Sequence, residues 1–194
     1  MGRCEWAVGS DLMRIYHDTE WGVPVHEDRK LFEYLLLDSF QAGLSWSTIL
    51  RKRDAFRQAF REFDPEAVAN MTDADLAVLA QDPGIVRNRA KIIAARNNAG
   101  RFLEVAAEFG TFAAYFWSFV GGEAIQNEWP AITDVPAETV ESRALSADLK
   151  RRGFSFVGPT IVYAVMQSAG LVNDHAAACY RRQELRPAGY SREL

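Results

Sequence analysis

Cysteine and histidine are scarce in this chain, with two cysteines and three histidines among 194 residues. Two cysteines are too few for the disulfide frameworks that hold small secreted domains together. Long apolar runs are also missing, because charged residues or glycine interrupt them well before the ~18 residues that a membrane-spanning helix needs. No apolar signal-peptide core follows Met1. We therefore expect a protein with no membrane segment and no export signal.

Strand patterns are equally scarce, because no alternation of apolar and polar residues lasts more than a few positions. There is no internal repeat and no linker rich in glycine or serine. Hydrophobic residues make up 48% of the chain and charged residues 25%, as in ordinary soluble proteins. A chain of this length buries roughly 70% of its unfolded surface when it folds. These features predict a single all-α domain over residues 1–194.

Apolar residues at helical spacing cover most of the chain. Two helix starts are marked, by Asp64 with Pro65 at the first helical position and by Thr72 with Asp75, which resemble a capping box. Helical periodicity is predicted over residues 28–36, 48–63, 88–108, 113–120, 141–152 and 154–171. The last of these segments is nearly all apolar, so we expect it to be the buried central helix. Residues 124–140 contain two prolines and are expected to form the longest loop.

Residues 76–91 predict two helices joined by a tight turn at Asp82-Pro83-Gly84. Gly84 allows a positive φ in this turn, which would expose backbone N–H groups at the positive end of the second helix. Such a turn forms an anion site suited to one DNA phosphate. Three basic residues surround it: Arg87, Arg89 and Lys91. This is the logic of a helix-hairpin-helix near residues 76–100, and a plain helical hairpin is the commoner alternative.

The charged residues are unevenly distributed, although the net charge is −4. Residues 83–103 contain five bases and no acids, whereas residues 104–148 contain eight acids and one base. Further basic clusters lie at residues 51–53 and 150–152. A protein with separated charge can present a basic face to phosphates while it stays acidic overall. The alternative is that these residues form solvated helix faces.

The four residues Cys4, His17, His175 and Cys179 lie in two groups near the two ends of the chain. In the His175-x3-Cys179 pair, a helix would place both side chains on one face, one turn apart. Two thiolates and two imidazoles make a closed tetrahedral zinc site of the structural type. Such a site would tie residues 3–21 to residues 173–180, where fraying is otherwise expected. The alternative is two unconnected pairs, because the spacing matches no standard zinc finger.

Aromatic residues are concentrated near the start of the chain, where Trp6, Tyr16, Trp21 and Trp46 lie in the first quarter. Asp38 stands among leucines and phenylalanine, so its carboxylate either faces water or is held within a pocket. Aromatic rings beside one buried carboxylate suit a flat cationic ring, which stacks on the rings while the acid offsets its charge. The alternative is that the tryptophans are core residues and Asp38 faces solvent.

Seven stretches of the sequence together carry a family resemblance. They are Arg3-Cys4-x-Trp6, Tyr16-His17-Asp18-x-Glu20-Trp21-Gly22-Val23-Pro24, Gln41-Ala42-Gly43-Leu44-Ser45-Trp46, Asp82-x-Gly84-Ile85-x-Arg87-x-Arg89-x-Lys91-Ile92, Trp117-Ser118-Phe119-Val120, Lys150-x-Arg152-Gly153-Phe154-x-Phe156-Val157-Gly158 and Met166-Gln167-x-x-Gly170-Leu171-Val172-Asn173-Asp174-His175. In this order, over residues 3–179, the chain resembles the 3-methyladenine DNA glycosylase I family, a branch of the helix-hairpin-helix DNA repair glycosylases.

The resemblance implies an all-α, helix-hairpin-helix DNA glycosylase fold with a zinc site joining the N- and C-termini. Its zinc ligands would be Cys4, His17, His175 and Cys179. It also implies base-excision repair, in which the N-glycosidic bond of 3-methyladenine in double-stranded alkylated DNA is hydrolysed after the base is flipped out of the duplex. A monomer in the bacterial cytoplasm, with no obligate protein partner, would carry out this reaction.

The resemblance also assigns roles to the residues near the start of the chain. Trp46 would stack on the base, while Tyr16 and a neighbouring carboxylate, here Asp38, would hydrogen-bond to it. Trp6 and Trp21 would help to line the pocket. The family lacks the catalytic aspartate that its relatives place after the hairpin. The resemblance therefore implies that the site selects and orients a base whose glycosidic bond is already weakened.

DNA contacts follow from the same resemblance. Residues 41–44 would fill the gap left in the duplex, with Gly43 in the loop and Leu44 as the wedge.

No lysine is placed as an obvious Schiff-base nucleophile, so we expect a monofunctional enzyme without strand cleavage. The tail at residues 181–194 carries four arginines, for which DNA contact and mobility both stay open.

One position departs from the family pattern, because the usual glutamate after Leu37 is replaced by Asp38. Aspartate is shorter by one methylene, so its oxygens retreat by about 1.5 Å, a C–C bond length. A hydrogen bond of about 2.9 Å would then need a backbone shift or a bridging water. Ser39, Phe40 and Met13 also differ from the usual neighbours.

We therefore expect excision of 3-methyladenine with a changed efficiency or lesion range. One alternative is a catalytically altered or inactive homologue that binds alkylated DNA, because Asp38 replaces the usual glutamate. Another is a zinc-dependent structural module with no DNA partner.

Overall fold

The structure of the protein is a computed structural model, and it describes residues 2–187. The final part of the predicted tail, residues 188–194, lies outside the described residues. The α-helices are α1 (Asp11–Thr19), α2 (Asp28–Gln41), α3 (Trp46–Ala59), α4 (Pro65–Ala69), α5 (Asp73–Leu79), α6 (Arg89–Phe109), α7 (Phe112–Ser118), α8 (Val140–Arg151), α9 (Pro159–Ser168) and α10 (Tyr180–Glu184). Shorter elements are the 3-10 helices η1 (Glu5–Ala7), η2 (Arg61–Phe63) and η3 (Ile132–Asp134), and the strands β1 (Ile125–Gln126) and β2 (Val172–Asn173).

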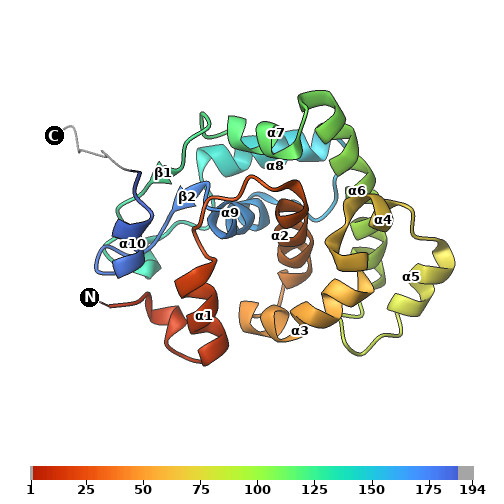
Figure 1. Cartoon of the computed structure of the whole chain (residues 1–194), viewed down its shortest axis with the longest axis horizontal. Coiled ribbons are helices and arrows are strands. Elements are labelled where there is room, and N and C mark those ends of the chain that lie inside the picture. The colour runs from red at the N-terminus through yellow and green to blue at the C-terminus, as the bar shows by residue number, and fades with distance from the viewer. Residues whose placement is uncertain (1, 188–194) are drawn as a thin grey trace.

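Helix α2 runs through the middle of the molecule (Figure 1) and is buried along its whole stretch from Leu31 to Phe40. It packs against α9 and α3, while α9 packs against α8, and α6 packs against α4 and α7. Helices α1 and α10 lie at one end of the molecule and α5 lies at the other (Figure 1). Strands β1 and β2 pair in parallel over two residues each. The prediction of a mostly helical protein is therefore confirmed.

The predicted central helix is shorter in the structure than in the sequence pattern. The pattern covers residues 154–171, whereas α9 covers only Pro159–Ser168. Pro159 stands at the first helical position, where its missing N–H costs no hydrogen bond, and Gly158 precedes it as the N-cap. Further into a helix the missing N–H would break the hydrogen-bond pattern, so the helix does not begin earlier. After Ser168, Gly170 adopts a φ of +72°, which ends a right-handed helix. Helix α2 therefore shares the central position with α9.

The local start signals read from the sequence are confirmed. The Asp64 side chain accepts hydrogen bonds from the backbone N–H groups of Glu66 and Ala67, ahead of Pro65 in α4. Thr72 and Asp75 form a reciprocal capping box at the start of α5. Each of these side chains satisfies N–H groups that have no partner inside the helix. The hairpin that carries the candidate phosphate site therefore begins where the sequence predicts.

Residues 80–88 form the turn between α5 and α6, and they correct one expectation. Gly84 does not adopt a positive φ. A side chain at position 84 would be too close to its neighbours, because a Cβ atom there would lie 2.9 Å from Oδ1 of Asp82 and 3.0 Å from Cβ of Ala55. The N–H of Gly84 donates to Oδ1 of Asp82 over 2.7 Å, and Nζ of Lys52 donates to the carbonyl oxygens of Pro83 and Gly84. The turn is therefore held against α3.

The two ends of the described chain meet. The N–H of Gly2 donates to the carbonyl of Ala178 over 3.2 Å, and the N–H of Tyr180 donates to the carbonyl of Gly2 over 3.1 Å. This pairing brings the segment before α1 beside the segment before α10. Across residues 2–187, the helices are too short or too polar to cross a bilayer.

The close approach of Gly170 to residues Val23 and Pro24 gives a test of the packing. A Cβ atom at position 170 would lie 2.4 Å from the carbonyl carbon of Val23, and the positive φ disfavours any side chain. We expect Gly170→Ala to lower the free energy of unfolding by about 2–4 kcal/mol. Chemical denaturation measures this change.

The matched control is Gly100→Ala, because Gly100 lies inside α6 with no atom within 4 Å of an added Cβ. That substitution should raise the free energy of unfolding by about 0.5–1 kcal/mol through helix propensity. Equal stabilities for the two variants would contradict the packing described.

Candidate active site and metal-binding cluster

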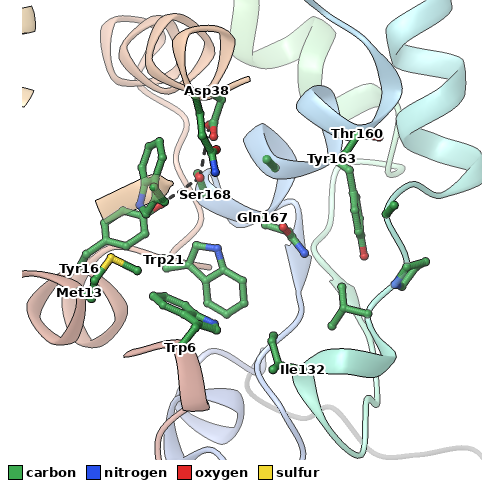
Figure 2. Close-up of a pocket in the computed structure, with 16 residues that line it drawn as sticks. Trp6, Met13, Tyr16, Trp21, Asp38, Ile132, Thr160, Tyr163, Gln167 and Ser168 are labelled. Atoms are coloured by element: carbon green, nitrogen blue, oxygen red, sulfur yellow. Dashed lines mark hydrogen bonds between the residues drawn. The ribbon is translucent and has the colours of Figure 1, made fainter. Parts of the chain in front are cut away.

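A cavity of about 430 Å³ opens between α1, α2, α9, the start of α3 and the loop that follows η3. Figure 2 shows the side chains that line it. The five residues that the sequence assigns to the base pocket all line this cavity: Trp6, Tyr16, Trp21, Asp38 and Trp46. The fold therefore brings together, from separate elements, the aromatic and acidic residues that the sequence predicts for one site.

Aromatic rings form one side of the cavity. The ring centroids of Trp6 and Trp21 lie 5.0 Å apart with an edge-on angle of 82°, and those of Tyr16 and Trp46 lie 5.3 Å apart. Nε1 of Trp46 is buried and finds no hydrogen-bond partner among the described residues. Such walls offer flat faces and ring edges, which suit a flat, electron-poor ligand.

Asp38 lies inside the cavity wall and is 2% exposed, so it does not face solvent. Its hydrogen-bond partner is Oγ of Ser168, at 3.5 Å from Oδ2. No lysine or arginine within residues 2–187 forms an ion pair with it. Burial raises the pKa of the Asp38 carboxyl well above its usual range, because the charged form loses its hydration.

Ser168 joins Asp38 to Tyr16. The Tyr16 hydroxyl donates to Oγ of Ser168 over 3.0 Å, and the Ser168 hydroxyl in turn donates to Asp38. Figure 2 shows Tyr16, Ser168 and Asp38 next to one another, with the two contacts as dashed lines. The three residues come from α1, α9 and α2, so the chain links the three helices that surround the site. Burial raises the pKa of Tyr16, which is therefore present as the phenol.

Gln167, which also lines the cavity, has a fixed orientation. Its Nε2 donates to Oδ2 of Asp174 over 2.8 Å, and Asp174 also accepts from the Tyr163 hydroxyl and from the side chains of Asn127 and Trp129. A carboxylate only accepts, so the amide nitrogen of Gln167 must face Asp174. The amide oxygen of Gln167 is thereby left as an acceptor at the cavity wall.

Several cavity residues are missing from the sequence-based site. Gln167 belongs to the stretch around Gly170 that carries the resemblance, but no role is assigned to it there, and Ser168 stands at an unspecified position of that stretch. Ile132, Val135 and Pro136 come from the loop predicted only as irregular. No local pattern points to that loop, because only the fold of the whole chain brings it to the cavity.

The loop between α2 and α3 lies beside the cavity, whose lining includes Gln41 and Trp46 at its two ends. Gly43 adopts a φ of +84°, and no atom lies within 4 Å of a Cβ built there. Leu44 follows it and is 42% exposed. The predicted wedge residue therefore projects from the protein next to the predicted pocket.

Lys91 differs from its predicted place. The sequence assigns it to the surface around the hairpin, but it is 6% exposed. Its Nζ donates to the carbonyl oxygens of Phe40 and Ala42 over 3.0 and 2.9 Å, at the C-terminal end of α2. Cations are favoured there by the helix dipole. In this structure Lys91 therefore anchors the loop after α2 and does not face a phosphate.

Arg87 and Arg89 are exposed beside the hairpin turn, and neither takes part in an ion pair within residues 2–187. Most other bases of the predicted basic segments are paired with acids. These pairs are Arg53 with Glu20 and Glu33, Arg96 with Asp73, Arg101 with Glu104, and Arg151 and Arg152 with Asp148. The hairpin therefore carries two exposed bases that have no acidic partner among residues 2–187.

The four predicted metal ligands form one buried cluster. Their ligand atoms in Cys4, His17, His175 and Cys179 all lie within 4.8 Å of one another. Sγ of Cys179 lies 3.3 Å from Nε2 of His17 and 3.5 Å from Nδ1 of His175. A tetrahedral zinc ion with usual bond lengths separates sulfur and nitrogen ligands by about 3.5 Å. The cluster fits a metal ion, and the alternative of two unconnected pairs is wrong.

The other nitrogen of each histidine is also held. Nδ1 of His17 lies 2.8 Å from Oδ1 of Asp18, and Nε2 of His175 lies 3.1 Å from the carbonyl oxygen of Trp21. Oxygen acceptors at these positions fix the ring orientation that a metal ligand needs. Because the side chain of Trp21 lines the cavity, the cluster is connected to the cavity through one residue.

Comparisons with known proteins agree with this arrangement. A sequence model of the family described as methyladenine glycosylase matches residues 6–182. DNA-3-methyladenine glycosylase 1 of Escherichia coli K12 is 45% identical over 179 residues, which cover 92% of this chain and 96% of that protein. DNA-3-methyladenine glycosylase of Haemophilus influenzae is 45% identical over 177 residues, which cover 91% of this chain and 96% of that protein.

Solved structures are similar in the same way. A crystal structure of 3-methyladenine DNA glycosylase I has a TM-score of 0.89 and 45% identity, and the match covers 92% of this chain and 98% of that one. A variant of such an enzyme in complex with 3-methyladenine has a TM-score of 0.90 and 36% identity, with 94% and 98% covered. The matched segment contains the whole cavity, and the chain therefore belongs to the methyladenine glycosylase family.

Proposed function

We propose that this protein is a monofunctional DNA glycosylase of base-excision repair, which hydrolyses the N-glycosidic bond of 3-methyladenine in double-stranded alkylated DNA. The observation that carries the proposal is the position of Asp38, a buried carboxylate in an aromatic cavity that forms no ion pair with the residues that the structure describes. The relatives named as 3-methyladenine glycosylases support it, because they match over nearly the full length of both chains.

Methylation at N3 gives adenine a positive charge and makes it a good leaving group. The aromatic walls attract a cationic ring, and Asp38 offsets the charge at low dielectric, where the interaction is strong. When the glycosidic bond breaks, its electron pair goes to the base and the positive charge passes to the sugar. Water then adds to the sugar and loses a proton. The site selects and orients a weakened bond, and each tenfold gain in rate requires only about 1.4 kcal/mol of differential binding.

The base reaches the cavity by flipping out of the duplex. Leu44 is exposed at the cavity edge and would fill the gap that the base leaves. Arg87 and Arg89, which are exposed beside the hairpin turn, would hold phosphates of the DNA backbone. Lys91 contributes indirectly, because it anchors the carbonyl groups at the start of the wedge loop.

Strand cleavage is not part of the proposed reaction. The residues that line the cavity include no lysine within the described chain. Lys91, which lies near α2, directs its ammonium to two backbone carbonyls, and burial lowers its pKa. Without an amine in the cavity no Schiff base forms with the sugar, so a monofunctional hydrolase is the fitting class.

We also propose that the buried cluster holds a structural zinc ion. The donor set of Cys4, His17, His175 and Cys179 supplies four protein ligands, which leaves no open position for substrate or water. A zinc ion bound there contributes folding energy and ties the two chain ends together. The residues themselves position Trp21 through the contact between its carbonyl oxygen and His175.

The substitution Asp38→Asn tests the proposed role of the acid. It removes the negative charge and keeps the shape of the side chain. A charge-assisted hydrogen bond contributes about 1.5–3 kcal/mol, so single-turnover release of 3-methyladenine from methylated duplex DNA should fall about 10- to 150-fold. Release by the parent should also fall as the pH drops through the raised pKa of Asp38, because protonation removes the charge.

Chromatographic identification of the released base provides the measurement, and binding of undamaged duplex is the control. Asp38→Asn should bind that duplex as the parent does, because Asp38 is buried in the cavity wall and is not part of the exposed surface. A parent protein that binds methylated DNA but releases no base would instead support the non-catalytic alternative.

The exposed arginines predict a change in salt dependence. We expect Arg87→Gln with Arg89→Gln to weaken duplex binding and to reduce the slope of log K against log salt by about 0.9 for each phosphate that is no longer neutralised. Fluorescence anisotropy at several salt concentrations measures the slope. Arg101→Gln is the control, because Arg101 is already paired with Glu104 on the same helix. A double variant with an unchanged slope would exclude these arginines from the DNA interface.

Metal analysis tests the cluster. Native mass spectrometry should find one zinc ion per chain. Removal of the zinc by a chelator should strongly lower the melting temperature, because a structural zinc ion contributes about as much free energy as the whole free energy of unfolding of a typical domain. Cys179→Ser, which breaks the donor set, should respond to the chelator much less. A metal-free protein with an unchanged melting temperature would contradict the assignment.

A further inference from the structure

The hydroxyl of Ser168 stands between two residues of the candidate site. Ser168 is 3% exposed and is the last residue of α9. It accepts a hydrogen bond from Tyr16 over 3.0 Å and donates one to Asp38 over 3.5 Å. A buried hydroxyl with one acceptor and one donor contact has a defined orientation. Both hydrogen bonds therefore have a defined direction: Tyr16 in α1 donates to Ser168, and Ser168 donates to Asp38 in α2.

Asp38 alone is poorly placed to reach across the cavity. It lies near the last turn of α2 and is buried with a side chain of only one methylene, so its carboxylate stays close to the helix backbone. No hydrogen bond joins Asp38 directly to Tyr16; the contact between them runs through Ser168. The serine hydroxyl therefore bridges the gap between the short acid and Tyr16.

We propose that Ser168 is a positioning residue, whose hydroxyl extends the short acid Asp38 to Tyr16 and so presents both residues to the base in one geometry. The proposal rests on the proposed function of the cavity. With the Tyr16 proton directed to Ser168, the lone pairs of the Tyr16 oxygen face away from it and can accept a hydrogen bond from the amino group of a bound adenine. Hydrogen bonds in such a chain strengthen one another.

This arrangement makes a prediction that a purely structural serine does not make. If Ser168 compensates for the missing methylene of Asp38, a longer acid at position 38 makes the serine dispensable. Asp38 lines an open cavity of about 430 Å³, which leaves room for one additional methylene. The two positions are therefore expected to be strongly non-additive in a double-mutant cycle.

The experiment compares four proteins, namely the parent, Ser168→Ala, Asp38→Glu and the double variant. Single-turnover release of 3-methyladenine from methylated duplex DNA should fall about tenfold or more for Ser168→Ala in the parent background, the loss expected for a hydrogen bond to a charged group. In the Asp38→Glu background the same substitution should cost no more than about twofold, within the scatter of independent sites.

A second cycle measures binding of free 3-methyladenine to the same four proteins by quenching of tryptophan fluorescence. It involves no bond breaking, so it separates the two claims. A parent that binds the base but releases none contradicts the proposed function, while the binding cycle still decides the role of Ser168. The melting temperature of each variant shows whether it is folded.

Ser146→Ala is the matched control, because Ser146 is also a buried helical serine whose hydroxyl donates to a backbone carbonyl, in α8 outside the cavity lining. It should leave base release within about twofold of the parent. The proposal is overturned if Ser168→Ala equals the parent in both cycles. It is also overturned if the loss is the same with aspartate and with glutamate at position 38.

Discussion

The candidate site depends on a carboxylate that is held out of water and has no cationic partner among the described residues. Asp38 is buried at the wall of an aromatic cavity, and its hydrogen-bond partner is a single serine hydroxyl. Burial of a charge is costly unless a partner compensates for it. The positive charge of the alkylated base supplies that partner before the glycosidic bond breaks, whereas an undamaged base, which is neutral, does not. The unfavourable burial of the Asp38 charge therefore makes the site bind a cationic base in preference to a neutral one.

The surrounding fold serves to keep this cavity open and its walls in place. Trp21 connects the cavity to the four-residue Cys/His cluster, because its side chain lines one and its carbonyl oxygen accepts from His175 of the other. At the opposite edge, Lys91 holds the end of α2 from which the wedge loop departs. Both supports come from residues far from Asp38 in the chain, and both leave the cavity itself free of cationic side chains among the described residues.

The sequence predicts what depends on neighbouring residues. The capping box at Thr72 and the proline start at Pro65 are local, and the structure confirms both. The positive φ expected at Gly84 is wrong, because the constraint there is the distance to Ala55 on another helix. Lys91 continues a run of exposed bases in the sequence, yet the end of α2 buries it. The contact of Ser168 with Asp38 spans 130 positions, so no local pattern predicts it.

The most direct test is a crystal structure of the protein with 3-methyladenine bound. We expect the ring inside the cavity, stacked on Trp46, with its amino group toward the oxygen atoms of Tyr16 and Asp38. A ring that lies outside the cavity, or that turns its amino group away from the acid, would contradict the role given to the buried carboxylate.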